Sequence, residues 1–357
     1  MIRVTDKKIL FTGDFFYDYD DVRDDVINIG KWIRENDYMT VVNLEGPLAV
    51  PAPEHAVEKR GPNLAASGTA AMILKELNTA GASLANNHMM DYGEYGLKST
   101  ISILDDKEIK HTGAGLTLEE ALTPFVIDTG SVKTGVLSFG WDVEETRYAS
   151  VRGAGCAPRD KDVIIRAVRD AKEMYDRVVV CMHWGFEFNR YPMPYDIDLA
   201  HALIDAGADL IIGSHPHCVQ PYEEYRGKMI FYSLGNFYFG SKRDMFTKVF
   251  EEKITNQPDH GIMVIYEPMS GTTDTKLIVY SREEKVSRLS ETGKEEILQA
   301  LPGLEEKEYL KAARKARNNS TPVLTADEKK NARKIKALYT LYALKKAFRT
   351  VIPRRSQ

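Results

Sequence analysis

Seven side chains that can bind a divalent metal ion stand directly after short apolar runs of this chain. They are Asp14, Glu45, Asn87, His88, His183, His215 and His217. Short apolar runs that end at polar residues are typical of buried strands, and α/β proteins build their sites at the carboxyl ends of strands. Carboxylate, amide and imidazole groups together suit Mn²⁺, Fe²⁺ or Zn²⁺, and the absence of a Cys-x-x-Cys pair argues against a structural zinc site.

The clearest of these places follows the apolar residues 210–212, which predict a buried strand that ends at Gly213. Pro216 stands between His215 and His217. Because proline fixes its own φ and restricts the residue before it, we expect it to hold both histidines extended. An isolated His-x-His pair is an ordinary loop feature. The other strand-end residues favour the metal interpretation.

The apolar runs alternate with helical patterns, which favours α/β layering. Strands are predicted at 9–12, 39–43, 82–85, 109–112, 177–182 and 210–212. Helices are predicted at 21–35, 95–104, 162–175 and 197–206, and a further helical segment stops at Gly81. Antiparallel pairs are predicted for 125–128 with 134–139 and for 262–266 with 276–280, so the sheets should be mixed.

Composition predicts a globular body, residues 1–284, followed by a polar to basic helical extension, residues 285–357. The chain has 357 residues, of which 43% are hydrophobic. Residues 311–357 hold 14 Lys and Arg against 2 Asp and Glu, although the whole chain has a formal charge of −4. A helix with an apolar stripe is predicted at about 325–352. It either docks on the acidic body or contacts an anionic membrane surface, and both interpretations stay open.

The expected location is the cytoplasm, with a possible peripheral place at the inner face of the membrane through this basic extension. No apolar run approaches the roughly 20 residues of a transmembrane helix, and the first residues enter a strand without a signal-peptide core. The three cysteines are too few for a disulfide framework. No nucleic-acid partner is expected.

An ordered set of short motifs resembles the CapA family of capsule and poly-γ-glutamate biosynthesis proteins, a branch of the calcineurin-like metallophosphoesterase fold. The motifs are GD at 13–14, NLEGPL at 43–48, ANNHMMDYG at 85–93, GAG at 113–115, HWGFE at 183–187, GSHPH at 213–217 and SLGNF at 233–237. The resemblance implies a layered α/β sandwich in which mixed sheets are flanked by helices.

The resemblance also implies roles for the strand-end residues. The implied metal ligands are Asp14, Glu45, Asn87, His183, His215 and His217. His88 would protonate a leaving oxygen or steady a phosphoryl oxygen, with Asp91 orienting it. Metallophosphoesterases begin with Asp-x-His, whereas this chain has Phe16 in place of the histidine. Whether the centre holds one ion or two therefore stays open.

Three further residues are candidates for substrate binding, each with a structural alternative. Trp184 either stacks on a sugar or forms a wall of the pocket. Glu187 either contacts the substrate or supports the metal ligands. Asn236 is either a polar residue of the site or a turn former.

Two functions follow from the resemblance. The first is a metal-dependent hydrolase or transferase that acts on an anionic polymer, with phosphoester and γ-glutamyl amide bonds as equally suitable targets. The second is a non-catalytic, metal-binding accessory subunit of a membrane polymer synthase.

Overall fold

The computed structural model describes residues 7–59, 61–140, 147–241 and 259–301. The predicted helix at 325–352 lies outside these ranges, so the structure does not test it. No helix among the described residues is long and apolar enough to cross a membrane.

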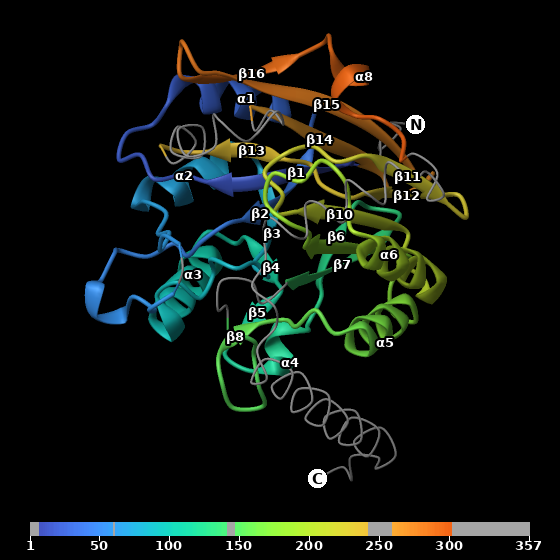
Figure 1. Cartoon of the computed structure of the whole chain (residues 1–357), viewed down its shortest axis with the longest axis horizontal. Coiled ribbons are helices and arrows are strands. Elements are labelled where there is room, and N and C mark those ends of the chain that lie inside the picture. The colour runs from blue at the N-terminus through green and yellow to red at the C-terminus, as the bar shows by residue number, and fades with distance from the viewer. Residues whose placement is uncertain (1–6, 60, 141–146, 242–258, 302–357) are drawn as a thin grey trace.

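The larger of two main sheets contains the first strand of the chain. Its order is β16-β15-β14-β1-β2-β3-β4, and β13 also pairs with β1. The parallel strands are β1 (Ile9–Phe16), β2 (Met39–Leu44), β3 (Thr79–Ser83), β4 (Lys110–Thr112) and β13 (Asn236–Phe239). An antiparallel edge is added by β14 (His260–Glu267), β15 (Thr272–Ser281) and β16 (Val286–Ser290). These three strands are drawn in orange tones at the top of Figure 1.

The second sheet has the order β11-β12-β10-β9-β7-β6. Its strands are β6 (Phe125–Asp128), β7 (Lys133–Gly140), β9 (Arg177–His183), β10 (Leu210–Ser214), β11 (Tyr222–Tyr225) and β12 (Lys228–Phe231). The antiparallel pairing of β6 with β7 confirms the predicted hairpin. A small third pair joins β5 (Ala114–Gly115) to β8 (Gly155–Cys156).

Helices cover the outer faces of the two sheets. The helices are α1 (Asp24–Glu35), α2 (Gly68–Glu76), α3 (Gly93–Asp106), α4 (Leu118–Ala121), α5 (Lys161–Lys172), α6 (Pro194–Ala206) and α8 (Lys294–Ile297), with the 3-10 turn η1 (Pro53–His55). Buried residues of α1, α2 and α3 share one hydrophobic cluster with the larger sheet. Those of α5 and α6, which lie side by side in Figure 1, share another with the second sheet.

The inner faces of the sheets pack on each other through a third hydrophobic cluster. This cluster contains Phe11 and Val41 from the larger sheet and Val179 and Ile212 from the second. Side chains alternate along a strand, so Val180, the neighbour of Val179, faces the helices instead. The predicted layered sandwich with mixed sheets and outer helices is confirmed.

Two observed elements differ from the sequence predictions. Gly81 does not stop a helix but lies inside β3, where a Cβ atom would meet the ring of Phe125 at 2.3 Å. The preceding helix ends at Glu76, because Asn78 takes the left-handed conformation with φ 50°. The larger sheet also continues past the predicted body boundary at residue 284, since β16 still pairs with β15.

Candidate metal centre

The carboxyl ends of strands from both sheets meet at one place. Asp14 of β1 pairs with Asn43 of β2 on one side and with Asn236 of β13 on the other. In the second sheet the end of β10 pairs with His183 of β9. The backbone N–H of His215 lies 3.3 Å from each carboxylate oxygen of Asp14. This contact joins the two sheets, so the predicted strand-end residues do converge.

Asp14, Glu45 and His217 form a buried group of candidate ligands. One ligand atom of each lies within 4.8 Å of the others. Nδ1 of His217 is 3.3 Å from Oδ2 of Asp14, and its Nε2 is 3.5 Å from Oε1 of Glu45. Neither Glu45 oxygen has a hydrogen-bond partner among the described residues. Burying a carboxylate in this way is costly, and a bound cation would offset the cost.

Asn87, His183 and His215 form a second group of candidate ligands. Oδ1 of Asn87 lies 2.8 Å from Nε2 of His183, and the rings of His183 and His215 are 4.8 Å apart. Nδ1 of His215 has no hydrogen-bond partner in the part of the chain that the structure describes. Burial, and then the nearby imidazoles, lowers the pKa of both histidines well below the ordinary value. Both are therefore neutral, the form that binds a metal.

The first group attracts positive charge. Burial raises the pKa of Glu45 well above its ordinary value, and the charge of Asp14 adds to the effect. Burial opposes protonation of His217, but the carboxylates of Glu45 and Asp14 outweigh it and raise the pKa of His217 to about 10. The two carboxyl groups thus favour positive charge on the group between them. A metal ion bound at His217 would displace the ring proton, because the neutral imidazole is the ligand.

Close backbone approaches set the ligand positions. A Cβ atom on Gly13 would lie 1.9 Å from the carbonyl oxygen of Gly235, so only glycine lets the GD and SLGNF segments touch. The expectation that Pro216 holds its neighbours extended is wrong. His215 has φ 96° and His217 has φ 53°, both in the left-handed region. Such backbone is strained in residues other than glycine and clusters at functional sites.

Phe16 fills the position of the missing histidine with an apolar ring. Its ring centroid is 5.6 Å from that of Phe239, which in turn meets the ring of His217 edge-on at 4.8 Å. Phe16 is 1% exposed and belongs to the core beside the helices. This side of His217 is therefore bounded by packing, and Phe16 offers no ligand.

His88 and Asp91 lie together, and Lys59 contacts both of them. Nδ1 of His88 is 2.7 Å from Oδ2 of Asp91. Nζ of Lys59 is 2.5 Å from Oδ1 of Asp91 and 3.1 Å from Nδ1 of His88. His88 directly follows the candidate ligand Asn87 in the chain, so this trio lies beside the candidate ligands.

Sequence reasoning missed two of these residues. Asn43 donates from Nδ2 to Oδ1 of Asp14 at 2.8 Å and lies 3.4 Å from Nδ1 of His183. Asn43 lies near the end of β2, the strand that Glu45 follows. Its place at a strand end could have identified it from the sequence. Lys59 stands in a loop without periodicity, so nothing local marks it.

The three predicted substrate-binding residues have different surroundings. Trp184 is 0% exposed in the hydrophobic cluster of the second sheet, and its Nε1 donates to the carbonyl oxygen of Tyr232 at 2.8 Å. These contacts are those of a core side chain and give substrate stacking no support. Asn236 begins β13, and its Oδ1 lies 2.9 Å from Nδ1 of His217. Glu187 is partly exposed, and its charge reaches Glu45 and His217.

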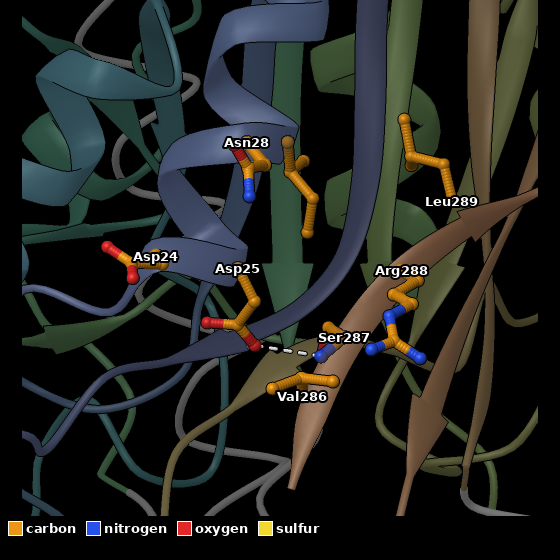
Figure 2. A pocket seen from close by; sticks show the side chains of 8 residues that line it. Asp24, Asp25, Asn28, Val286, Ser287, Arg288 and Leu289 are labelled. Atoms are coloured by element: carbon orange, nitrogen blue, oxygen red, sulfur yellow. Dashed lines mark hydrogen bonds between the residues drawn. The ribbon is translucent and has the colours of Figure 1, made fainter. Parts of the chain in front are cut away.

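A pocket of about 360 Å³ lies between α1 and β16, and no candidate residue lines it. Figure 2 shows the lining residues, among them Asp25 and Asn28 of α1 and residues 286–289 of β16. Oδ2 of Asp25 accepts a 2.7 Å hydrogen bond from the backbone N–H of Ser287. The bond fastens the edge strand to the helix.

The fold and the site together define an α/β sandwich protein with a buried cluster of carboxylates and imidazoles at its strand ends. The chain matches the model of the bacterial capsule synthesis protein family PGA_cap over residues 2–241, and it belongs to this family.

Two curated relatives come from Bacillus species. The chain is 36% identical over 208 residues to the PGA biosynthesis protein CapA of Bacillus subtilis (strain 168), covering 58% of this chain and 54% of that protein. It is 32% identical over 218 residues to the capsule biosynthesis protein CapA of Bacillus anthracis, covering 59% and 53%. The chain thus spans about half the length of these curated relatives.

Solved structures show a looser likeness. A 5'-nucleotidase precursor from Thermus thermophilus has a TM-score of 0.47 at 11% identity, over 78% of this chain and 55% of that chain. The NAD nucleotidase NadN of Haemophilus influenzae has a TM-score of 0.44 at 12% identity, over 88% and 60%.

Proposed function

We propose that the chain is a metal-dependent hydrolase or transferase that acts on an anionic polymer during capsule or poly-γ-glutamate synthesis. The observation that carries the proposal is the buried group of Asp14, Glu45 and His217, in which both Glu45 oxygens lack a hydrogen-bond partner among the described residues. Membership of a capsule synthesis family supports the process. The names of the Bacillus relatives support the polymer.

The donor set fits a divalent ion. Carboxylate oxygens, an amide oxygen and neutral imidazoles are ligands that Mn²⁺, Fe²⁺ and Zn²⁺ accept. The residues that would hold one or two ions are Asp14, Glu45, Asn87, His183, His215 and His217. A bound ion would supply an activated water and polarise a phosphoryl or carbonyl oxygen.

The remaining chemistry belongs to the chain itself. Asn43 fixes the carboxylate of Asp14 and Asn236 fixes the ring of His217, so the ligands are held before any ion binds. In the proposed mechanism the imidazolium form of His88 gives its Nε2 proton to the leaving oxygen or nitrogen, and the neutral ring that remains keeps its proton on Nδ1. In this mechanism Asp91 accepts from Nδ1 of His88, and Nε2 is the nitrogen that exchanges the proton. Glu187 at the partly exposed side of the site contacts the substrate.

A non-catalytic accessory role is the second candidate, and two observations favour it. Phe16 supplies packing where a ligand would be expected. A relative from Mycobacterium tuberculosis (strain CDC 1551 / Oshkosh), 32% identical over 166 residues, is named a probable polyglutamine synthesis accessory protein. In that role the chain would bind metal and assist a membrane polymer synthase without turnover.

Metal analysis of the purified protein combined with a substrate screen tests the proposal. We expect the wild-type protein reconstituted with Mn²⁺ or Zn²⁺ to bind metal and to cleave a phosphomonoester, a phosphodiester or a γ-glutamyl amide. The double variant His183→Ala/His215→Ala should lose the metal, whereas His111→Ala, outside the candidate centre, should keep it. Equal metal content in wild type and double variant would refute the centre. Metal binding without turnover would favour the accessory role.

A further inference from the structure

Among the described residues, the loop that follows η1 contacts Asp91 at three points. The backbone N–H of Val57 donates to the carbonyl oxygen of Asp91 at 2.9 Å. The backbone N–H of Leu64 donates to Oδ2 of the same residue at 2.7 Å. Between these two anchors, Lys59 reaches Oδ1 at 2.5 Å. Asp91 therefore holds both ends and the middle of the loop, and the loop carries Lys59 to His88.

The side chain of Lys59 is buried far more deeply than is usual for lysine. It is 3% exposed, and its partner Asp91 is 1% exposed. Taking both charges out of water costs several kcal/mol per ion, and their attraction offsets this only with good geometry and further hydrogen bonds. A packing role alone would be met as well by an apolar side chain. The ion pair therefore points to a role in the site.

Two groups compete for one nitrogen of His88. If Nδ1 carries a proton, it donates to Oδ2 of Asp91 at 2.7 Å. If Nδ1 carries a lone pair, it accepts from Nζ of Lys59 at 3.1 Å. One nitrogen cannot do both. The shorter contact to a carboxylate is the stronger, so Asp91 accepts the proton of Nδ1 in a hydrogen bond as long as its Oδ2 stays in place.

We propose that Lys59 is a positioning residue that holds the Asp91 carboxylate so that His88 keeps its proton on Nδ1. The ammonium group binds Oδ1, and Oδ2 is thereby turned toward His88 and the N–H of Leu64. With Nδ1 protonated, Nε2 is the nitrogen that meets the reacting group. This inference rests on the proposed function for its effect on turnover, but the tautomer of His88 is a property of the protein alone.

Histidine ¹⁵N NMR of the full chain loaded with Zn²⁺ tests the inference, with His88→Gln used to assign the His88 signals. Protonated and bare imidazole nitrogens give well-separated signals. We expect wild type to show a protonated Nδ1, Lys59→Met to show a mixture of tautomers, and Lys59→Arg to restore the wild-type pattern. The exposed lysine of α3 gives the matched control, Lys98→Met, which should change nothing. If Lys59→Met shows no cooperative unfolding and is therefore not folded, Lys59→Gln takes its place in the experiment. Glutamine keeps a hydrogen-bond donor but lacks the charge.

Turnover gives the second measurement. Lys59→Met should lower kcat by about 10- to 100-fold, the usual effect of losing a group that orients a residue of the site. The change in KM should be smaller, and the metal content should stay the same. Unchanged His88 signals in Lys59→Met would overturn the inference even if turnover falls. If wild type turns over no substrate, the proposed function fails, and the NMR result still decides the role of Lys59.

Discussion

At the scale of single residues, Glu45 shows why the site is costly to fold. Its carboxylate is 0% exposed, and neither oxygen has a hydrogen-bond partner among the described residues. An unsatisfied buried polar group costs about 1–3 kcal/mol, and more when it is charged. We therefore interpret the unsatisfied carboxylate of Glu45 as a group that binds a ligand. The same reasoning applies to Nδ1 of His215.

His88 separates catalysis from metal binding. Its Nδ1 is held by Asp91 at 2.7 Å, and it is not needed as a ligand. We therefore expect His88→Asn to keep its metal and to lose turnover by about 10²–10⁴-fold, because general acid catalysis has that size. Metal analysis and steady-state kinetics of the same preparation check this. An unchanged rate would remove His88 from the mechanism, and a lost metal would make it a ligand.

The sequence predicts the candidate ligands better than the residues that position them. Asp14, His183 and His215 follow apolar runs, and a strand end can be recognised locally. Asn43 and Lys59 depend on partners that are distant in sequence: Lys59 meets His88, 29 positions along the chain, across a loop. No periodicity marks such a contact. The sequence also did not predict the left-handed backbone of His215 and His217. The conformational preference of residues next to a proline is an average, and individual residues depart from it.

At the scale of elements, most strands and helices of the body follow from apolar runs and helical spacing. The differences lie where tertiary packing decides. Gly81 reads as a stop signal, yet β3 needs a residue without a side chain beneath Phe125. The strand β16 carries a polar sequence, VSRLS, and becomes a strand only because β15 offers its edge. Local propensity is weak in such strands, and pairing overrides it.

Asp209 joins elements of the second sheet. Its carboxylate accepts from Nζ of Lys172 on α5 at 2.7 Å, from Nζ of Lys228 on β12 at 2.8 Å, and from the backbone N–H of Val178 on β9 at 3.0 Å. Burial acts to raise the pKa of Asp209, but these donors together outweigh it and hold the pKa below its ordinary value of 3.8. The charged form is therefore the one that stabilises the fold.

We expect Asp209→Asn to lower the free energy of unfolding by about 1–2 kcal/mol at neutral pH, the usual value of hydrogen bonds to a charged group reduced for partial solvent screening. The folded-state pKa is depressed, so the contribution is complete above pH 3.8 and is lost as the pH falls through the folded-state pKa. Urea unfolding at several pH values measures it. Asp106, an exposed aspartate at the end of α3, supplies the control. Asp106→Asn should change the free energy of unfolding little. A penalty that stays constant down to about pH 3 would contradict the role of the charge.

At the scale of the whole molecule, charge is divided unevenly along the chain. Residues 311–357 carry 14 Lys and Arg against 2 Asp and Glu, so the remainder is acidic although the formal net charge is only −4. A basic segment of this kind has two natural partners, the acidic body or an anionic membrane. Near an anionic leaflet each Lys or Arg contributes roughly 1 kcal/mol. We propose that this segment brings the protein to the inner face of the membrane, where a polymer synthase would work.

Sedimentation with lipid vesicles tests that location. At low salt the full chain should pellet with anionic vesicles and stay in solution with neutral ones, because the attraction is electrostatic and is screened by salt. A chain that ends at Thr321 lacks most of the basic segment and should stay in the supernatant with both. Raising the salt should release the full chain from the anionic vesicles. Equal sedimentation of the two chains would contradict membrane binding by the basic segment. It would assign the basic residues to contacts with the acidic body or with a protein partner, which neutralise their charge.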